Sequence, residues 1–114
     1  MSFNGTEGEA ISLETGATYT KNYRDENPTG VQSAFYGRDL LEALLAQPGS
    51  MGIRVYYGLN EDGIQELVLV SADADENDNL NLIVDKSIKC PPRCPTKNAL
   101  NSWLISYILF PYTF

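Results

Sequence analysis

The sequence predicts an α+β fold, in which an antiparallel three- to four-stranded meander is packed by two N-terminal helices and one C-terminal helix. Three observations predict it. Apolar residues alternate with other residues from Met51 to Leu59, which is typical of a strand with one buried face. The Asp-Gly pair at residues 62–63 separates this strand from a second apolar run, which indicates a hairpin. Leucines at helical spacing precede the hairpin: Leu40, Leu41, Leu44 and Leu45.

The first half contains two predicted helices. Residues 1–10 are polar and rich in Gly and Glu, so we expect a flexible N-terminal tail, followed by a single α+β domain over residues 11–114. Ser12 is placed to cap a helix that ends before Pro28, because the residue before proline avoids helical geometry. Residues 31–36 are a candidate fourth strand. Asp39 is placed to cap the second helix, which Pro48-Gly49 ends.

The second half contains the sheet and the last helix. Residues 64–72 include four consecutive apolar residues, so we expect this strand to be central and covered on both faces. Residues 73–79 form a turn, and residues 80–89 a third strand. The proline-rich segment 90–95 can be neither helix nor central strand, because proline lacks a backbone N–H. Asn98 is placed to cap a final helix that Pro111 ends.

Composition makes several functions improbable. The net charge of -7 repels nucleic-acid phosphates, so we expect no nucleic-acid partner. The chain has no histidine, which removes the commonest general base and the commonest metal ligand, and we expect neither a metal nor another cofactor. No window is apolar over the roughly 18 residues of a spanning helix, so we expect a soluble protein with no integral membrane span. The first nine residues do not resemble a secretory signal, which makes the cytoplasm the default location.

A resemblance rests on three segments that occur in this order: Gly52-Ile53-Arg54-Val55-Tyr56-Tyr57-Gly58-Leu59, Leu67-Val68-Leu69-Val70, and Cys90-Pro91-Pro92-Arg93-Cys94. Together they resemble a family of small uncharacterised bacterial proteins that has no established function. The resemblance spans roughly residues 12–102, and the apolar residues after Trp103 lie beyond it. It implies a shared fold and a bacterial source, and it implies no activity.

The acidic turn is the first candidate site. Asp73, Asp75, Asn77 and Asn79 place oxygen atoms at alternating positions, as calcium loops do. The sixth and twelfth positions of such a loop hold Asp78 and Val84 here, where calcium loops have glycine and a bidentate acid. We therefore favour a solvated hairpin turn.

Cys90 and Cys94 are the second candidate, as a disulfide or redox pair. Redox motifs normally place two cysteines three apart at a helix N-terminus, whereas these are four apart between prolines. We favour a rigid covering loop in which both sulfurs act as small apolar plugs, and the disulfide stays open as an alternative.

Arg54 and Tyr56 are the candidate ligand-binding residues, because both lie on the less apolar face of the first strand. An arginine there can bind a carboxylate or phosphate of a ligand with two hydrogen bonds. It more often pairs with a carboxylate of its own chain, for which we considered Asp39, Glu42 and Asp85.

The C-terminal segment is the candidate interface. Apolar and aromatic residues dominate it, and four of them are candidate contact residues: Trp103, Tyr107, Phe110 and Phe114. A helix that is apolar on more than one face can cover its own core and still contact a second copy.

These features favour a non-enzymatic binding or protein-interaction module that forms a homodimer through the C-terminal segment. One alternative is a small-ligand-binding protein or an enzyme that uses Arg54, tyrosines and carboxylates. A second is peripheral membrane association through the aromatic C-terminal segment. No catalytic residues are assigned, and the sequence leans away from an enzyme without deciding the question.

Overall fold

The computed structural model describes residues 2–102, which form two compact units. The elements in chain order are α1 (Leu13–Glu26), β1 (Ser33–Phe35), α2 (Arg38–Leu45), β2 (Gly52–Leu59), β3 (Gln65–Ala72), β4 (Asp78–Val84) and β5 (Ile88–Cys90). The first unit joins the N-terminal residues up to Gly8 with Ala34–Ile88, and the second joins Glu9–Ser33 with the residues from Lys89 onward. The sequence predicted a single domain over residues 11–114, and that prediction does not distinguish these two units.

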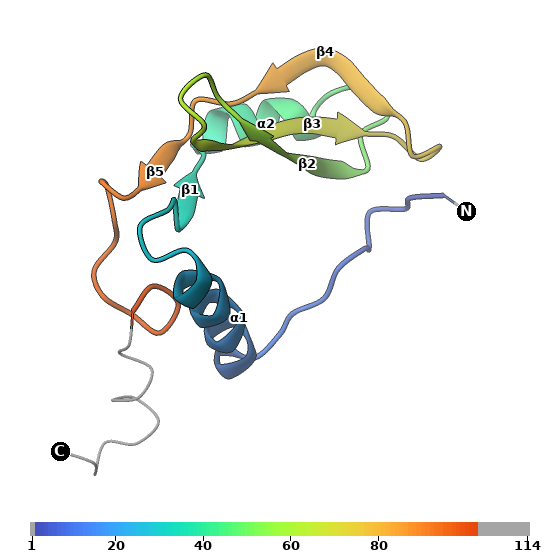
Figure 1. The fold of residues 1–114 in the computed structure, drawn as a ribbon. Coiled ribbons are helices and arrows are strands. Elements are labelled where there is room, and N and C mark those ends of the chain that lie inside the picture. Colours follow the sequence, from blue (N-terminus) through green and yellow to red (C-terminus); the bar gives the residue numbers. More distant parts are fainter. Residues whose placement is uncertain (1, 103–114) are drawn as a thin grey trace, which may run out of the picture. The chain divides into compact units, whose positions relative to one another are not determined.

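The predicted meander is confirmed. β2, β3 and β4 form one antiparallel sheet in that order, with β3 in the centre (Figure 1). The β2–β3 register is regular from Gly52, opposite Ala72, to Leu59, opposite Gln65. The β3–β4 register shifts between Leu69 and Ser71, so β4 is irregular.

The core of the first unit lies between α2 and one face of this sheet. Leu44 of α2 is 0% exposed and packs with Leu69 of β3 and Val84 of β4. Ile53 of β2 packs against the edge of this cluster. The leucine spacing therefore correctly predicted the helix and two residues of its buried face, Leu41 and Leu44, whereas Leu40 and Leu45 are exposed. The helix begins two residues earlier than expected, because its N-cap is Gly37 and Asp39 lies in the first turn.

Two strand predictions were wrong. Residues 31–36 do contain a strand, but β1 pairs with β5 in a separate two-stranded sheet and does not widen the meander. The expected third strand, residues 80–89, is two strands, because the chain leaves extended geometry between Val84 and Ile88. Lys86 lies there with φ 63°, a left-handed conformation that breaks a strand.

In the second unit, α1 has the predicted cap. The Ser12 Oγ accepts the Thr15 N–H at 3.0 Å, and the helix ends at Glu26, before Asn27 and Pro28. Arg24 donates to the carbonyl of Leu100 at 2.8 Å and to that of Ser102 at 3.2 Å.

The expected C-terminal helix lies mostly outside the described residues. Asn98 does begin a turn, in which its side chain accepts the Leu100 N–H at 2.8 Å. Among residues 2–102, no helix has both the length and the apolar character needed to cross a membrane.

Candidate functional site

Arg54 and Tyr56 lie on one face of the sheet, as the strand period predicts. They are two residues apart in β2, opposite Val70 and Val68 of β3. Asp78 of β4 pairs with Ala72 of β3, and Ala72 pairs with Gly52 of β2. Period-two alternation therefore places Asp78 on the same face as Arg54 and Tyr56. This face is opposite to the one that α2 covers.

The carboxylate of Asp78 joins the two predicted residues. The Arg54 Nη1 donates to Asp78 Oδ1, and the Tyr56 hydroxyl donates to Asp78 Oδ2. The Arg54 Nη1 also donates to the carbonyl of Glu76 at 3.2 Å. Both of these Arg54 bonds use Nη1, and the Tyr56 side chain also interacts with the guanidinium. The Nε and Nη2 of Arg54, which carry three N–H groups, take no part in the bonds to Asp78 and Glu76.

The three carboxylates considered from the sequence as partners of Arg54 were therefore wrong: Asp39, Glu42 and Asp85. Asp39 and Glu42 belong to α2, which packs on the other face, and the carboxylate of Glu42 lies 4.0 Å from Arg38. Asp85 follows the end of β4. Asp78 was overlooked because the third strand was expected to begin at residue 80. The hairpin register was the missing signal, because continuing the alternation past Ala72 places Asp78 on this face.

The pKa shifts in this group follow from its hydrogen bonds. The Tyr56 hydroxyl, followed by the Arg54 guanidinium, lowers the pKa of Asp78, although partial burial opposes the shift. The bond to Asp78 raises the pKa of Tyr56, because an ionised phenol would lose this bond and face a second anion. Asp78 also raises the pKa of Arg54. At neutral pH the group therefore contains a cation, an anion and a neutral phenol.

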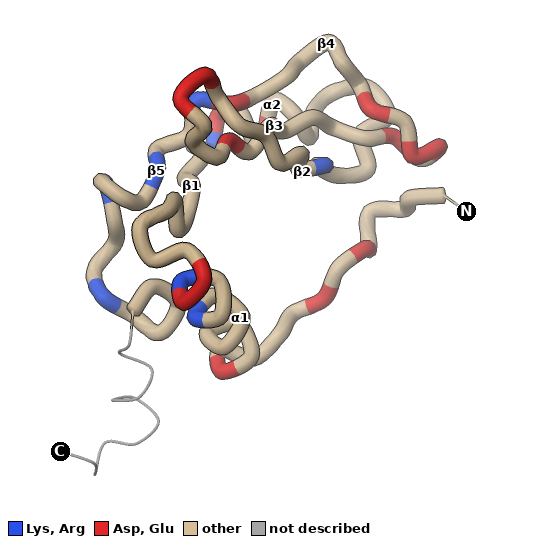
Figure 2. Tube along the Cα trace, in the orientation of Figure 1, with Lys and Arg blue, Asp and Glu red and all other residues tan. Residues whose placement is uncertain are grey.

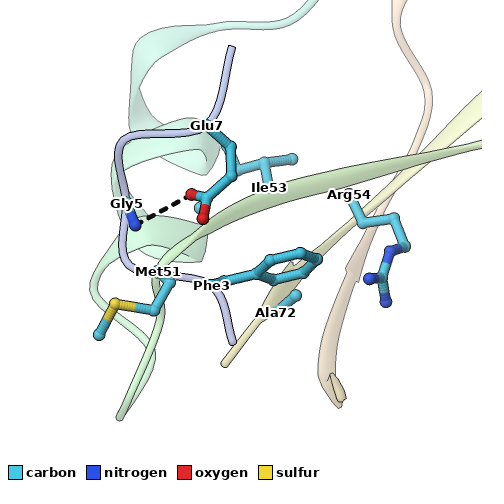
Figure 3. Close-up of a pocket in the computed structure, with 8 residues that line it drawn as sticks. Phe3, Gly5, Glu7, Met51, Ile53, Arg54 and Ala72 are labelled. Atoms are coloured by element: carbon cyan, nitrogen blue, oxygen red, sulfur yellow. Dashed lines mark hydrogen bonds between the residues drawn. The ribbon is translucent and has the colours of Figure 1, made fainter. Parts of the chain in front are cut away.

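A hollow lies beside Arg54, between the sheet and the N-terminal residues. The Phe3 N–H donates to the carbonyl of Ala74 at 3.0 Å, and the Phe3 ring centre lies 5.4 Å from the Arg54 guanidinium carbon, a cation–π contact. Figure 3 shows the ring extending along β2 toward Arg54, with the Glu7 carboxylate near Gly5. The hollow has a volume of about 350 Å³. Its lining residues are Phe3, Gly5, Glu7, Met51, Gly52, Ile53, Arg54 and Ala72.

Glu7 holds a charged carboxylate at this hollow. Its Oε2 accepts the Asn4 N–H at 2.9 Å, and its Oε1 accepts the Gly5 N–H at 3.0 Å. These backbone donors, that of Asn4 foremost, lower the pKa of Glu7. A flexible tail was predicted for these residues. The contact between Phe3 and Arg54 joins residues far apart in sequence, so no local pattern indicated it, whereas the bonds of Glu7 to Asn4 and Gly5 are local.

The cysteine pair lies in the second unit. Cys90 and Cys94 are joined as a disulfide, with their Cα atoms 4.7 Å apart, in place of the two separate apolar plugs that we favoured. Cys90 is buried. In this bonded state neither sulfur is a thiolate, so the structure offers no nucleophile here.

The acidic turn adopts the hairpin geometry that we favoured. The Asp73 Oδ1 accepts the N–H of Asp75 at 2.9 Å and that of Asn77 at 3.0 Å. Within residues 2–102, no three acidic or cysteine side chains converge in a way that could hold a metal ion. The four candidate interface residues lie outside the described residues: Trp103, Tyr107, Phe110 and Phe114.

No family model, curated protein or solved structure matches this chain. Its function therefore has to be inferred from the geometry of its own side chains.

Proposed function

We propose that this chain is a non-enzymatic interaction module that associates with a second copy of itself through the outer edge of β2, which pairs with no other strand within residues 2–102. The observation that carries the proposal is a row of exposed apolar side chains on this edge strand. Val55, Tyr57 and Leu59 are 46%, 82% and 74% exposed. Exposed apolar rows of this kind mark interaction sites, and a strand at the edge of a sheet is a template for pairing with another chain.

The hydrogen-bond pattern of the hairpin shows which backbone groups face the free edge. The Asn60 N–H donates to the Ile64 carbonyl at 2.9 Å, in the same register that pairs Tyr56 with Val68. In an antiparallel ladder, alternate residues exchange hydrogen bonds with the neighbouring strand. The even-numbered residues of β2 therefore bond to β3. The odd-numbered residues direct their N–H and C=O groups to the open edge: Ile53, Val55, Tyr57 and Leu59.

β2 also lacks the features that normally protect an edge strand. Proteins block such edges with charges, prolines, bulges or short strands. β2 is eight residues long with a regular register, and Arg54, its one charged residue, is bonded to Asp78. The opposite edge of the sheet, β4, has the register shift. The two edges therefore differ, and β2 is the one suited to pairing.

A second copy fits this edge by symmetry. When two β2 strands pair antiparallel about a two-fold axis at Tyr56, Val55 lies opposite Tyr57 of the second copy, and Ile53 lies opposite Leu59. Each pair is apolar on both sides and matches open backbone groups. Arg54 lies opposite Gly58, so the cations of the two copies do not meet.

The charge distribution supports self-association over pairing with a basic partner. The chain has a net charge of -7, but β2 contains no acidic residue (Figure 2). Acidic positions gather instead in the two turns that flank β3, with Glu61 and Asp62 before it and Asp73, Asp75 and Glu76 after it (Figure 2). A basic partner would bind where the acidic residues are, whereas two copies can approach through the strand that lacks them.

Sedimentation equilibrium of the full chain tests the proposal. We expect a dimer whose dissociation constant rises at least about tenfold in Tyr57→Lys, because a charge on an edge strand opposes pairing. Tyr19→Lys is the matched control, because Tyr19 lies on α1 and is 64% exposed. We expect this variant to associate as the wild type does.

Two results would overturn the proposal. One is a wild-type chain that stays monomeric as its concentration is raised. The other is a dimer that survives Tyr57→Lys but is lost when residues 103–114 are deleted. That result would assign the interface to the C-terminal segment, as the sequence analysis expected.

A further inference from the structure

We infer that the hollow between the N-terminal residues and β2 binds a small zwitterionic molecule, either a free amino acid with an apolar side chain or a short apolar peptide. The volume of about 350 Å³ lies at the small end of the range for ligand pockets, which is roughly 300–1,000 Å³. It therefore suits a molecule of this size better than a nucleotide or a large cofactor. The site is separate from the exposed row formed by Val55, Tyr57 and Leu59, and Ile53 is the one lining residue that also belongs to the proposed pairing edge.

The first recognition element is the available part of the Arg54 guanidinium. Nη1 is engaged by Asp78 and by the Glu76 carbonyl, and these bonds fix the plane of the group. Nε and Nη2 take no part in these two bonds, and together they form one edge of a fork that fits a carboxylate. The Phe3 ring packs over the same guanidinium. Arg54 is thus held in place before a ligand arrives, which lowers the entropic cost of binding.

The second recognition element is the Glu7 carboxylate, which lines the same hollow. Its two oxygens each accept one backbone N–H, from Asn4 and Gly5, so its position is fixed. Each carboxylate oxygen can accept a further hydrogen bond. Glu7 can therefore receive an ammonium group without giving up the bonds that hold it.

The balance of charge decides the class of ligand. One cation, Arg54, is accompanied by two anions, Asp78 and Glu7. A simple anion such as phosphate would meet a net negative site and is disfavoured. A zwitterion satisfies both ends, with its carboxylate on Arg54 and its ammonium on Glu7. The remaining lining offers apolar contact for a side chain through Phe3, Met51 and Ile53.

This inference is tested by titrating the full chain with matched probes. Binding is measured as heat by calorimetry and as chemical-shift changes of the Gly5 and Gly52 amide resonances in NMR spectra. The probes are leucine and leucyl-leucine, 4-methylpentanoate as leucine without the ammonium, 3-methylbutylamine as leucine without the carboxylate, and inorganic phosphate. We expect saturable binding of leucine or of leucyl-leucine, and which of the two binds tighter separates the two sources. We expect each of the other three probes to bind at least about tenfold more weakly, because each leaves one charged group without its partner.

Variants test each recognition element. Arg54→Lys keeps the charge and removes the fork, and Glu7→Gln removes the second charge. We expect each to weaken binding of the better zwitterion at least about tenfold. Arg38→Lys and Glu9→Gln are the matched controls, since Arg38 lies on exposed α2 surface and Glu9 is exposed outside the hollow. Phe3→Leu, which leaves the Arg54–Asp78 pair intact, provides a further variant if Arg54→Lys destabilises the fold.

Three results would overturn the inference. The first is no saturable binding of either leucine or leucyl-leucine. The second is equal affinity for 4-methylpentanoate, the amine or phosphate. The third is binding that none of Arg54→Lys, Glu7→Gln and Phe3→Leu weakens.

Discussion

Tyr56 on β2 donates its hydroxyl hydrogen bond to Asp78 on β4, so two strands that are not neighbours are joined across the central strand β3. Arg54 makes a second link to the same carboxylate. On β3, Val70 is the register partner of Arg54, and it is only 2% exposed. The side chains that cross from β2 to β4 therefore help to cover an apolar residue on the face that α2 does not reach.

We predict that Asp78→Asn lowers the free energy of unfolding at neutral pH, because an amide cannot accept two charge-assisted hydrogen bonds. The pKa of Asp78 is lowered in the folded chain, so its stabilising contribution is present above the ordinary value of 3.8 and is lost as the pH falls through the folded-state pKa. The difference between variant and wild type should therefore shrink in acid. Urea denaturation at neutral and strongly acidic pH measures it.

Asp75→Asn is the control for this experiment. Asp75 is an exposed residue of the turn before Asp78, and its backbone N–H donates to the Asp73 carboxylate. Equal urea midpoints for Asp78→Asn and Asp75→Asn at neutral pH would show that the link across β3 does not stabilise the fold.

We predict that Tyr56→Phe raises the pKa of Asp78 toward its ordinary value. The hydroxyl of Tyr56 is the largest cause of the lowered value, and Arg54 alone then remains to oppose protonation. Tyr57→Phe is the control, because Tyr57 points to the opposite face of β2. Carbon NMR titration of the Asp78 carboxyl group measures both. The assignment of cause fails if the two variants give the same pKa for Asp78.

Local signals in the sequence were enough to predict most of the elements. Ser12 and Pro28 bracket α1, and the leucine stripe identifies α2, although only Leu41 and Leu44 of the stripe face the core. The Asp-Gly turn fixes the β2–β3 hairpin, and alternation places Arg54 and Tyr56 together. Each of these features depends on residues close in the chain, where spacing and capping carry the information.

Features that depend on distant residues were not predictable in this way. Nothing local to residues 31–36 indicates β5 as the partner of β1. Asp78 required the register after the second turn, and that turn is two residues shorter at its end than the sequence suggested. The contact between Phe3 and Arg54 joins the N-terminus to β2. The sequence therefore predicted Arg54 and Tyr56 of the candidate site, but it did not predict Asp78 or Phe3, which contact them.

We predict that Leu44→Ala destabilises the chain by about 2–5 kcal/mol, because it removes a fully buried side chain and leaves a cavity against Leu69 and Val84. Leu45→Ala is the matched control, since the neighbouring leucine is 54% exposed. We expect it to cost less than about 1 kcal/mol. Chemical denaturation followed by circular dichroism measures both. Similar losses for the two variants would contradict the placement of the core.

Proline substitution at neighbouring positions of β2 distinguishes the edge that bonds to β3 from the outer edge. Tyr57 directs its N–H to the open edge, whereas Gly58 pairs with Glu66 and directs its N–H to β3. Proline has no N–H, so Tyr57→Pro removes a donor that no acceptor among the described residues uses, and Gly58→Pro removes one from the ladder. We predict that Gly58→Pro costs about 3 kcal/mol or more and that Tyr57→Pro costs much less.

The same pair of variants separates folding from association. Tyr57→Pro should stay folded by circular dichroism and sediment as a monomer, because it interrupts the edge that a second copy would need. Gly58→Pro should lose the fold and the dimer together. If Tyr57→Pro unfolds the chain and Gly58→Pro does not, our assignment of backbone groups is the wrong way round. The odd-numbered residues of β2 would then bond to β3, and the even-numbered residues would face the outer edge.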